Sequence, residues 1–157
     1  MGERARILVV DDDESIRKVL ATILEEEGCV VDTAKNGREA IKKSRLKFYN
    51  LALIDIRLTD MEGTKLLTEI KDTTPKMRKI IITGYPALQN AINALNKGAN
   101  AYIVKPFDMD KVLQTIKEQL KQQKEEKKYN QEKVTEFIET RVKELEEEKT
   151  MTHQKTR

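Results

Sequence analysis

The sequence of 157 residues has no tryptophan, one cysteine, one histidine and three prolines. Cys29 has no second cysteine with which to form an intrachain disulfide, so a disulfide-held fold is excluded. His153 lies in a polar tail without an apolar helix face around it, which makes it a poor candidate for a phosphohistidine, a metal ligand or a general base. Reactive chemistry is therefore expected from other residue types.

Long apolar runs are also missing. The longest, residues 7–10 and 51–54, are far shorter than the ~18 residues that a membrane span needs, and the chain does not open with a signal-peptide pattern. We therefore expect a cytoplasmic protein that does not associate with membranes. Charged residues make up 36% of the chain, but the net charge is only +3, and neither a basic arm nor a helix-turn-helix pattern is present. Direct nucleic-acid binding by this chain is not expected.

Short apolar runs alternate with amphipathic stretches from the start to about residue 107. This alternation predicts an α/β fold with a doubly wound parallel sheet, although the pattern alone leaves the strand order open. Ligands of such sheets bind where the carboxyl ends of neighbouring strands meet, so functional residues are sought at strand ends. The expected strands are Arg6–Val10, Cys29–Ala34, Leu51–Asp55, Lys79–Thr83 and Ala101–Val104.

Acidic residues gather at two of these strand ends. Asp11, Asp12 and Asp13 follow the first strand, and Asp55 closes the third. Carboxylates clustered at the rim of an apolar sheet repel one another unless a cation neutralises them, and Mg²⁺ with oxygen ligands suits this task. Asp11 and Asp12 are therefore expected to bind Mg²⁺. Acidic residues after a strand are also common helix N-caps, a role expected for Asp13 or Ser15.

A hydroxyl and an ammonium group stand at two further strand ends. Thr83 closes the fourth strand, and Lys105 follows the fifth. With Asp55 as the nucleophile that forms an acyl phosphate, Lys105 and Thr83 would bind phosphoryl oxygens. A single Asp, Thr or Lys at a strand end is ordinarily an exposed surface residue. The prediction of phosphoryl chemistry therefore rests on the occurrence of all of them together.

Four segments, ILVVDDDESIR, LALIDIRLTDMEG, IIITGYP and GANAYIVKPF, resemble the receiver domains of two-component response regulators over about residues 5–120. The resemblance implies a chemotaxis-receiver-like fold, with a five-stranded sheet in the order 2-1-3-4-5 and five helices. It also implies a role in phosphorelay signal transduction. The phosphoryl donor would be a phosphorylated histidine of a sensor histidine kinase or phosphotransfer protein, and Mg²⁺ would assist.

The resemblance assigns a role to each matching position. Asp55 corresponds to the phosphorylation site, Lys105 to the phosphate-binding lysine, and the backbone carbonyl of Arg57 to a metal ligand. Asp11 and Asp12 correspond to the acidic metal-binding pair, and Asp55 is expected to be a metal ligand as well. The Lys105 to Pro106 peptide bond is expected to be cis.

The same resemblance predicts a switch. Thr83 corresponds to the switch hydroxyl and Tyr102 to the switch aromatic, so Thr83 would move toward the phosphate and Tyr102 would turn inward. Arg57 and Tyr85 flank the site, and we expect them to affect the lifetime of the acyl phosphate. Thr59 stands where many receivers have proline, and Asn100 where many have aspartate. Neither departure touches the phosphate chemistry.

Beyond residue 108 the amino-acid composition shifts to lysine, glutamate and glutamine. We expect a receiver domain over 1–120, a helical extension over 121–149 that is a coiled coil or a linker, and a disordered tail over 150–157. The pattern leaves a continuous-helix homodimer and a solvated helix with a hinge equally open, and an output domain after residue 157 is a third interpretation. One heptad seam, broken by Gln123, Lys127 and Asn130, collects Leu113, Ile116, Leu120, Val134 and Phe137.

Two other functions compete with the receiver. In a phosphatase of the haloacid dehalogenase class, Asp11 would be the nucleophile of a D-x-D motif shared with Asp13. That interpretation leaves Asp55 without a role and lacks a convincing second acidic pair after Lys105. The third interpretation is a non-phosphorylated scaffold. We expect a phosphoacceptor switch rather than an enzyme, although the chain would take part in its own phosphorylation and dephosphorylation.

Overall fold

The computed structural model describes residues 4–71, 73, 75–84 and 87–155. The chain separates into two compact units, Met1–Gln123 and Lys124–Arg157. In the first, five parallel strands form one sheet in the order β2-β1-β3-β4-β5, which confirms the predicted fold and strand order. The strands are β1 (Arg6–Val10), β2 (Val30–Ala34), β3 (Leu51–Asp55), β4 (Arg78–Thr83) and β5 (Ala101–Val104).

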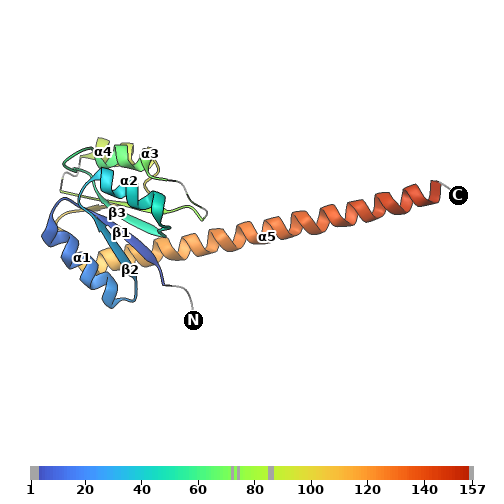
Figure 1. Cartoon of the computed structure of the whole chain (residues 1–157), viewed down its shortest axis with the longest axis horizontal. Coiled ribbons are helices and arrows are strands. Elements are labelled where there is room, and N and C mark those ends of the chain that lie inside the picture. The colour runs from blue at the N-terminus through green and yellow to red at the C-terminus, as the bar shows by residue number, and fades with distance from the viewer. Residues whose placement is uncertain (1–3, 72, 74, 85–86, 156–157) are drawn as a thin grey trace. The chain divides into compact units, whose positions relative to one another are not determined.

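Helices cover both faces of this sheet (Figure 1). On one face lie α2 (Gly37–Leu46), α3 (Gly63–Glu69) and α4 (Leu88–Asn96), and on the other lie α1 (Glu14–Glu26) and the first part of α5 (Met109–Lys155). Successive strand side chains alternate between the two cores, because the side-chain period of a strand is two. Leu8 and Val10 join the core under α2 to α4, whereas Ile7 and Val9 join the core under α1 and α5.

The central strands are buried from end to end. Every residue of β3 and β4 is buried, whereas β2 and β5 at the sheet edges are partly exposed. Strands covered on both faces need continuous apolar runs, which here are residues 51–54 of β3 and 80–82 of β4. β2 begins at Val30 rather than at Cys29, because the Cys29 amide donates to the Leu24 carbonyl and closes the end of α1. Gly28 provides the left-handed turn there, with φ of +90°.

The first unit extends past the predicted boundary at residue 120, because Gln123 belongs to it. The Gln123 side chain is buried, and its Nε2 donates to the carbonyls of Asn50 and Lys76 at 2.9 and 2.8 Å. Asn50 in turn donates its Nδ2 to Gln123 Oε1 at 3.3 Å. These hydrogen bonds satisfy backbone carbonyls just before the amino ends of β3 and β4. Gln123, which we predicted to interrupt a coiled-coil seam, is thus an anchor of the receiver.

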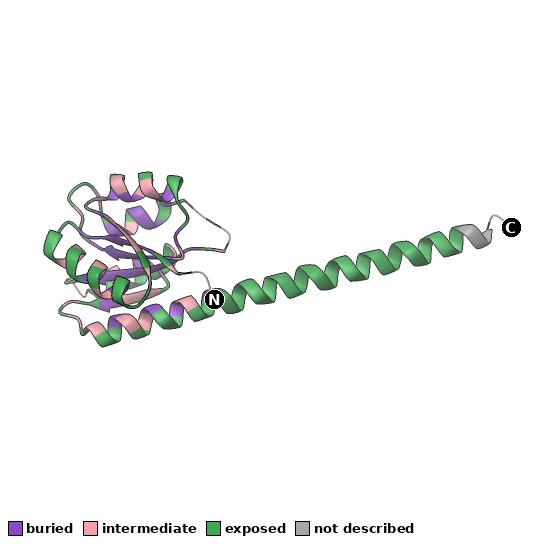
Figure 2. Ribbon diagram, turned by 60° about the horizontal axis from the view of Figure 1, so that its bottom comes forward, coloured by how far each residue is buried: buried purple, intermediate pink, exposed green. Residues whose placement is uncertain are grey.

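The first half of the predicted heptad seam packs on the sheet. Ile116 is buried in the core under α1 and α5, and Leu113 and Leu120 pack against that core. These three side chains are therefore not free to form a coiled coil. In the second unit, Figure 2 shows α5 exposed over residues 124–152. Its apolar stripe, with exposed fractions of 48 to 71%, consists of Val134, Phe137, Ile138, Val142 and Leu145.

We predicted a disordered tail over 150–157, and in the structure residues 150–155 continue α5. The chain has no glycine or proline after Pro106 to end the helix. The hydroxyls of Thr150 and Thr152 donate to the carbonyls of Glu146 and Glu148 within the helix. Residues 156–157 lie outside the described residues. Over the described part of the chain, every helix is too short or too polar to cross a membrane.

Candidate functional site

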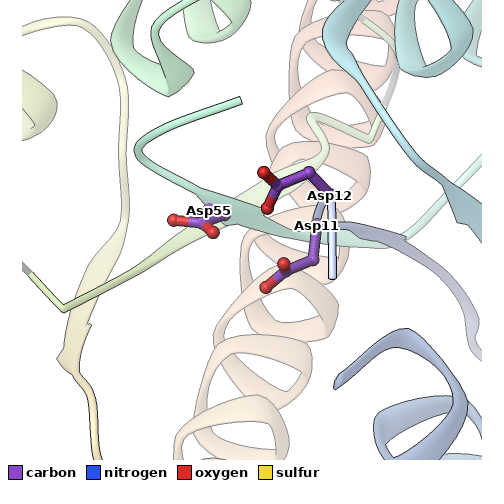
Figure 3. A group of neighbouring side chains, drawn as sticks. All are labelled: Asp11, Asp12 and Asp55. Atoms are coloured by element: carbon purple, nitrogen blue, oxygen red, sulfur yellow. The ribbon is translucent and has the colours of Figure 1, made fainter. Parts of the chain in front are cut away.

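Three carboxylates converge where β1 and β3 end side by side (Figure 3). Asp11 and Asp12 follow β1, and Asp55 is the last residue of β3. One oxygen of each lies within 4.8 Å of the others. Asp11 and Asp55 are 3% and 9% exposed, whereas Asp12 is open to solvent. The sheet order thus brings together the acidic residues that the sequence predicted at separate strand ends.

Lys105, at the end of β5, reaches across β4 to this cluster. Its Nζ donates to Asp11 Oδ2 at 3.1 Å and to Asp55 Oδ2 at 3.2 Å, and its backbone amide donates to the Thr83 carbonyl at 2.6 Å. Burial alone would lower the pKa of the Lys105 ammonium, but the charges and hydrogen bonds of the two carboxylates outweigh burial and raise that pKa. The lysine is therefore held in its charged form. The Lys105 to Pro106 peptide bond is cis, as predicted.

The ionised form of the Asp11 carboxyl remains disfavoured despite the nearby Lys105 ammonium. Burial and the Asp55 charge raise the pKa of the Asp11 carboxyl, while the Asp13 amide and Lys105 work in the opposite direction, and the net direction is upward. Added positive charge favours the ionised form of a buried carboxyl that lies beside a second carboxylate. A hard divalent cation with oxygen ligands would supply it, so the donor set of this site fits Mg²⁺.

The turn after β1 is fixed by the start of α1. Asp13 is the N-cap of α1, and its Oδ1 accepts from the amides of Ser15 and Ile16 at 2.8 and 3.3 Å. The prediction that Asp13 or Ser15 caps this helix is thereby confirmed, with Asp13 as the cap. Arg17, which sequence reasoning did not single out, donates its Nη1 to the Asp11 carbonyl at 2.7 Å. Helix α1 thus holds the backbone that carries the acidic pair.

The loop after Asp55 is held together by hydrogen bonds between its own residues. The Arg57 amide donates to Asp55 Oδ1 at 3.3 Å, and Arg57 forms an isolated antiparallel bridge with Glu62. The Gly63 amide donates to the Ile56 carbonyl at 2.6 Å and so begins α3 directly beneath the loop. Arg57, predicted to offer its carbonyl to the metal, therefore lies in a tight loop next to the predicted nucleophile.

The two predicted switch residues are partners in the structure. Thr83, the last residue of β4, is fully buried, and Tyr102 in β5 is half-buried. Burial raises the pKa of the Tyr102 phenol, while a side-chain hydrogen bond with Thr83 partly offsets this effect. The hydroxyl that would move and the aromatic ring that would follow are therefore already linked. Tyr85, predicted to affect phosphoryl lifetime, lies outside the described residues.

Gly63 is a structural requirement of the site that sequence reasoning missed. A Cβ atom there would lie 2.9 Å from Ile56 Cα and closer still to the Asp55 carbonyl oxygen. Both neighbours are backbone, which cannot rotate away. The sequence signal was a glycine shortly after Asp55, but only the fold shows that α3 begins against the backbone of the predicted nucleophile.

Comparison with known proteins defines the class. The response regulator receiver domain family matches residues 7–117. The transcriptional regulatory protein ZraR of Klebsiella oxytoca is 42% identical over 119 residues, which are 76% of this chain but 27% of that protein. A CheY-like receiver domain protein from Methanospirillum hungatei JF-1 superposes with a TM-score of 0.76 at 46% identity, covering 79% of this chain and 99% of its own.

A second solved structure, the beryllofluoride-activated NtrC4 receiver domain dimer, superposes with a TM-score of 0.70 at 41% identity, covering 75% of this chain and 98% of its own. The chain belongs to the response regulator receiver family, which confirms the predicted family and the phosphoacceptor role in two-component signalling. The phosphatase alternative is not supported. The chain spans about a quarter of the length of the curated relatives it matches.

Proposed function

We propose that Asp55 is the residue that accepts the phosphoryl group, and that Asp11, Asp12, Asp55 and the Arg57 carbonyl hold Mg²⁺ beside it. The convergence of three carboxylates within 4.8 Å, with Lys105 bridging two of them, carries this proposal. Bound Mg²⁺ would neutralise charge on the attacking and transferred oxygens. A bound cation would also offset the burial and the Asp55 charge that together disfavour ionised Asp11.

The protein side chains then perform the remaining steps. A carboxylate oxygen of Asp55 bonds to phosphorus as the P–N bond of the donor phosphohistidine breaks, and the imidazole nitrogen leaves with the electron pair. Lys105 already contacts Asp55 Oδ2, so its ammonium is placed to stabilise phosphoryl oxygens as charge builds on them. Thr83 would donate its hydroxyl to another phosphoryl oxygen, which loosens its bond with Tyr102 and releases that ring inward.

The first test is where the phosphoryl group goes. Incubation with acetyl phosphate and Mg²⁺ is expected to add one phosphoryl group to the intact protein, mapped by mass spectrometry to Asp55 after borohydride trapping. Asp55→Asn removes the nucleophilic oxygen and should abolish labelling, whereas Glu69→Gln on exposed α3 surface should not. Label at Asp11 would revive the phosphatase, and absence of label would revive the non-phosphorylated scaffold.

We propose further that the extension pairs two copies of the chain. Five exposed apolar side chains on one polar helix support this proposal. The pairing region is limited to the stripe beyond Gln123, since the earlier heptad positions pack on the sheet.

Light scattering tests the pairing. The chain is expected to have the mass of a dimer, with or without acetyl phosphate, and the double variant Ile138→Glu, Leu145→Glu that of a monomer. These two positions are one heptad apart on one face. Thr140→Glu, on the opposite face, is the matched control and should stay dimeric. A monomer in every case refutes the proposal.

The partner and the compartment complete the proposed function. The phosphoryl donor would be a sensor histidine kinase or a phosphotransfer protein, in the cytoplasm. The single free cysteine, Cys29, supports a reducing compartment. The near-neutral charge supports an output that does not depend on direct nucleic-acid binding by this chain.

A further inference from the structure

The tip of the loop after Asp55 is tied to a different helix. Asp60 Oδ1 accepts from the Gly37 amide at 2.8 Å, and Asp60 Oδ2 accepts from the Arg38 amide at 2.9 Å. One carboxylate therefore bridges the β3–α3 loop to the first two residues of α2. Its negative charge also lies at the positive end of that helix, where it is favourable.

Helix α2 cannot satisfy these two amides from its own segment. Its N-cap, Asn36, accepts from the Glu39 amide through Oδ1 at 2.9 Å, and the Asn36 carbonyl accepts from the Ala40 amide. The amides of Gly37 and Arg38 are the donors of the first turn that have no acceptor within the helix segment itself. Asp60 thus completes the capping of α2 from a loop that is distant in sequence.

A second contact fixes the same loop tip. The Met61 side chain occupies the space where a Cβ atom of residue 37 would be, so loop and helix approach as closely as a glycine allows. Met61 also packs against the core under α2 to α4. Two adjacent residues, Asp60 and Met61, therefore hold the loop tip by hydrogen bonds and by packing.

Backbone pairing within the loop connects its tip to Arg57, so a fixed tip also holds the backbone of Arg57 in place. The Leu58 amide donates to the Met61 carbonyl at 3.2 Å, and Arg57 is bridged to Glu62. The two sides of the loop are thus paired, with Asp60 at the turn between them. A movement of the turn away from α2 would displace the backbone on which the Arg57 carbonyl stands.

We propose that Asp60 is a positioning residue for the metal site, because its bridge to α2 holds the loop from which the Arg57 carbonyl would reach Mg²⁺. This inference rests on the proposed function, in which Arg57 supplies that carbonyl. Asp60 itself does not touch the reacting atoms. Its role is to keep one metal ligand in place before the metal binds, which lowers the cost of ordering the site.

Mg²⁺ titration by calorimetry tests the role of Asp60. Asp60→Ala is expected to raise the Mg²⁺ dissociation constant roughly tenfold, at the low end of the range for groups that orient metal ligands. The rate of Asp55 phosphorylation by acetyl phosphate should fall at low Mg²⁺ and recover toward the wild-type rate at saturating Mg²⁺. Asp60→Asn, which keeps one acceptor oxygen, should lie between the wild type and Asp60→Ala.

Two controls separate positioning from charge and from helix stability. Glu62→Ala removes the same charge from the same loop, but the Glu62 side chain makes no capping hydrogen bond. Asn36→Ala removes the other cap of α2 without touching the loop. Both variants are expected to bind Mg²⁺ within about twofold of the wild type, even though Asn36→Ala lowers the melting temperature as Asp60→Ala does.

The possible outcomes are distinct. If Glu62→Ala weakens Mg²⁺ binding as much as Asp60→Ala does, the effect is one of charge, and the positioning role is wrong. If Asn36→Ala does so, the effect is one of helix stability, and the role is equally wrong. Wild-type affinity in Asp60→Ala overturns this inference alone. A wild-type protein that neither binds Mg²⁺ nor accepts a phosphoryl group at Asp55 overturns the proposed function instead.

Discussion

Replacing Lys105 by alanine is expected to slow phosphorylation of Asp55 by roughly 10²- to 10³-fold while leaving Mg²⁺ binding at least as tight as in the wild type. The rate falls because the ammonium that contacts Asp55 Oδ2 can no longer stabilise phosphoryl oxygens. Mg²⁺ binding does not fall, because the same ammonium competes with the metal for Asp11 and Asp55. Stopped-flow phosphorylation and calorimetric Mg²⁺ titration measure the two effects separately.

The same variant should be less stable without Mg²⁺ near neutral pH, with a free energy of unfolding lowered by about 2 kcal/mol, because two buried carboxylates lose their shared cation. The folded-state pKa of Asp11 is already raised by burial and by Asp55, so stability falls as pH rises through that pKa. The deficit should therefore shrink as pH is lowered. Lys111→Ala, which removes an exposed lysine of α5, is the control. If Lys105→Ala lowered the Mg²⁺ affinity and the phosphorylation rate by the same factor, Lys105 would only hold the site together and would not stabilise phosphoryl oxygens.

Replacing Gly63 by alanine is expected to destabilise the fold by about 3 kcal/mol, because the added methyl group meets backbone atoms. The carbonyl oxygen of Asp55 and the Cα of Ile56 are the nearest neighbours, so relief requires that the backbone of the predicted nucleophile move. Phosphorylation of the surviving folded protein should therefore fall as well. Denaturant unfolding measures the stability, and acetyl phosphate labelling measures the activity.

Gly84→Ala is the matched control for stability. Gly84 follows β4 at the same end of the sheet, but a Cβ atom there would meet nothing within 4 Å, and its φ is not in the left-handed region. This variant should fold within about 0.5 kcal/mol of the wild type or be slightly more stable, because alanine restricts the unfolded chain. Equal losses in both variants would contradict the steric explanation for Gly63.

The sheet and the acidic cluster were predictable because both follow from local patterns. Buried strands such as β3 appear as continuous apolar runs, and parallel strands bring their carboxyl ends to one edge, so Asp55 had to lie near the end of another strand. Which strand lies beside β3 depends on the order of the strands. That order came from the family resemblance and not from the pattern of Asp11 and Asp12.

The contacts that support the site were not predictable, because they join distant segments through groups without a sequence signature. Asp60 looks like any turn aspartate until α2 is placed beside it, and Gln123 looks like surface until the amino ends of β3 and β4 expose the carbonyls of Asn50 and Lys76. Heptad spacing likewise does not reveal whether a seam packs on a second helix or on a sheet, as Ile116 demonstrates.

The bond between Lys105 and the two carboxylates has a consequence for the charge of the site. Three carboxylate charges and one ammonium charge leave two negative charges in excess, so one divalent cation would bring the site to electroneutrality. An acyl phosphate on Asp55 carries more negative charge than the carboxylate it replaces, so it disturbs that balance. In the proposed switch, the hydroxyl of Thr83, the last residue of β4, would turn toward that excess charge.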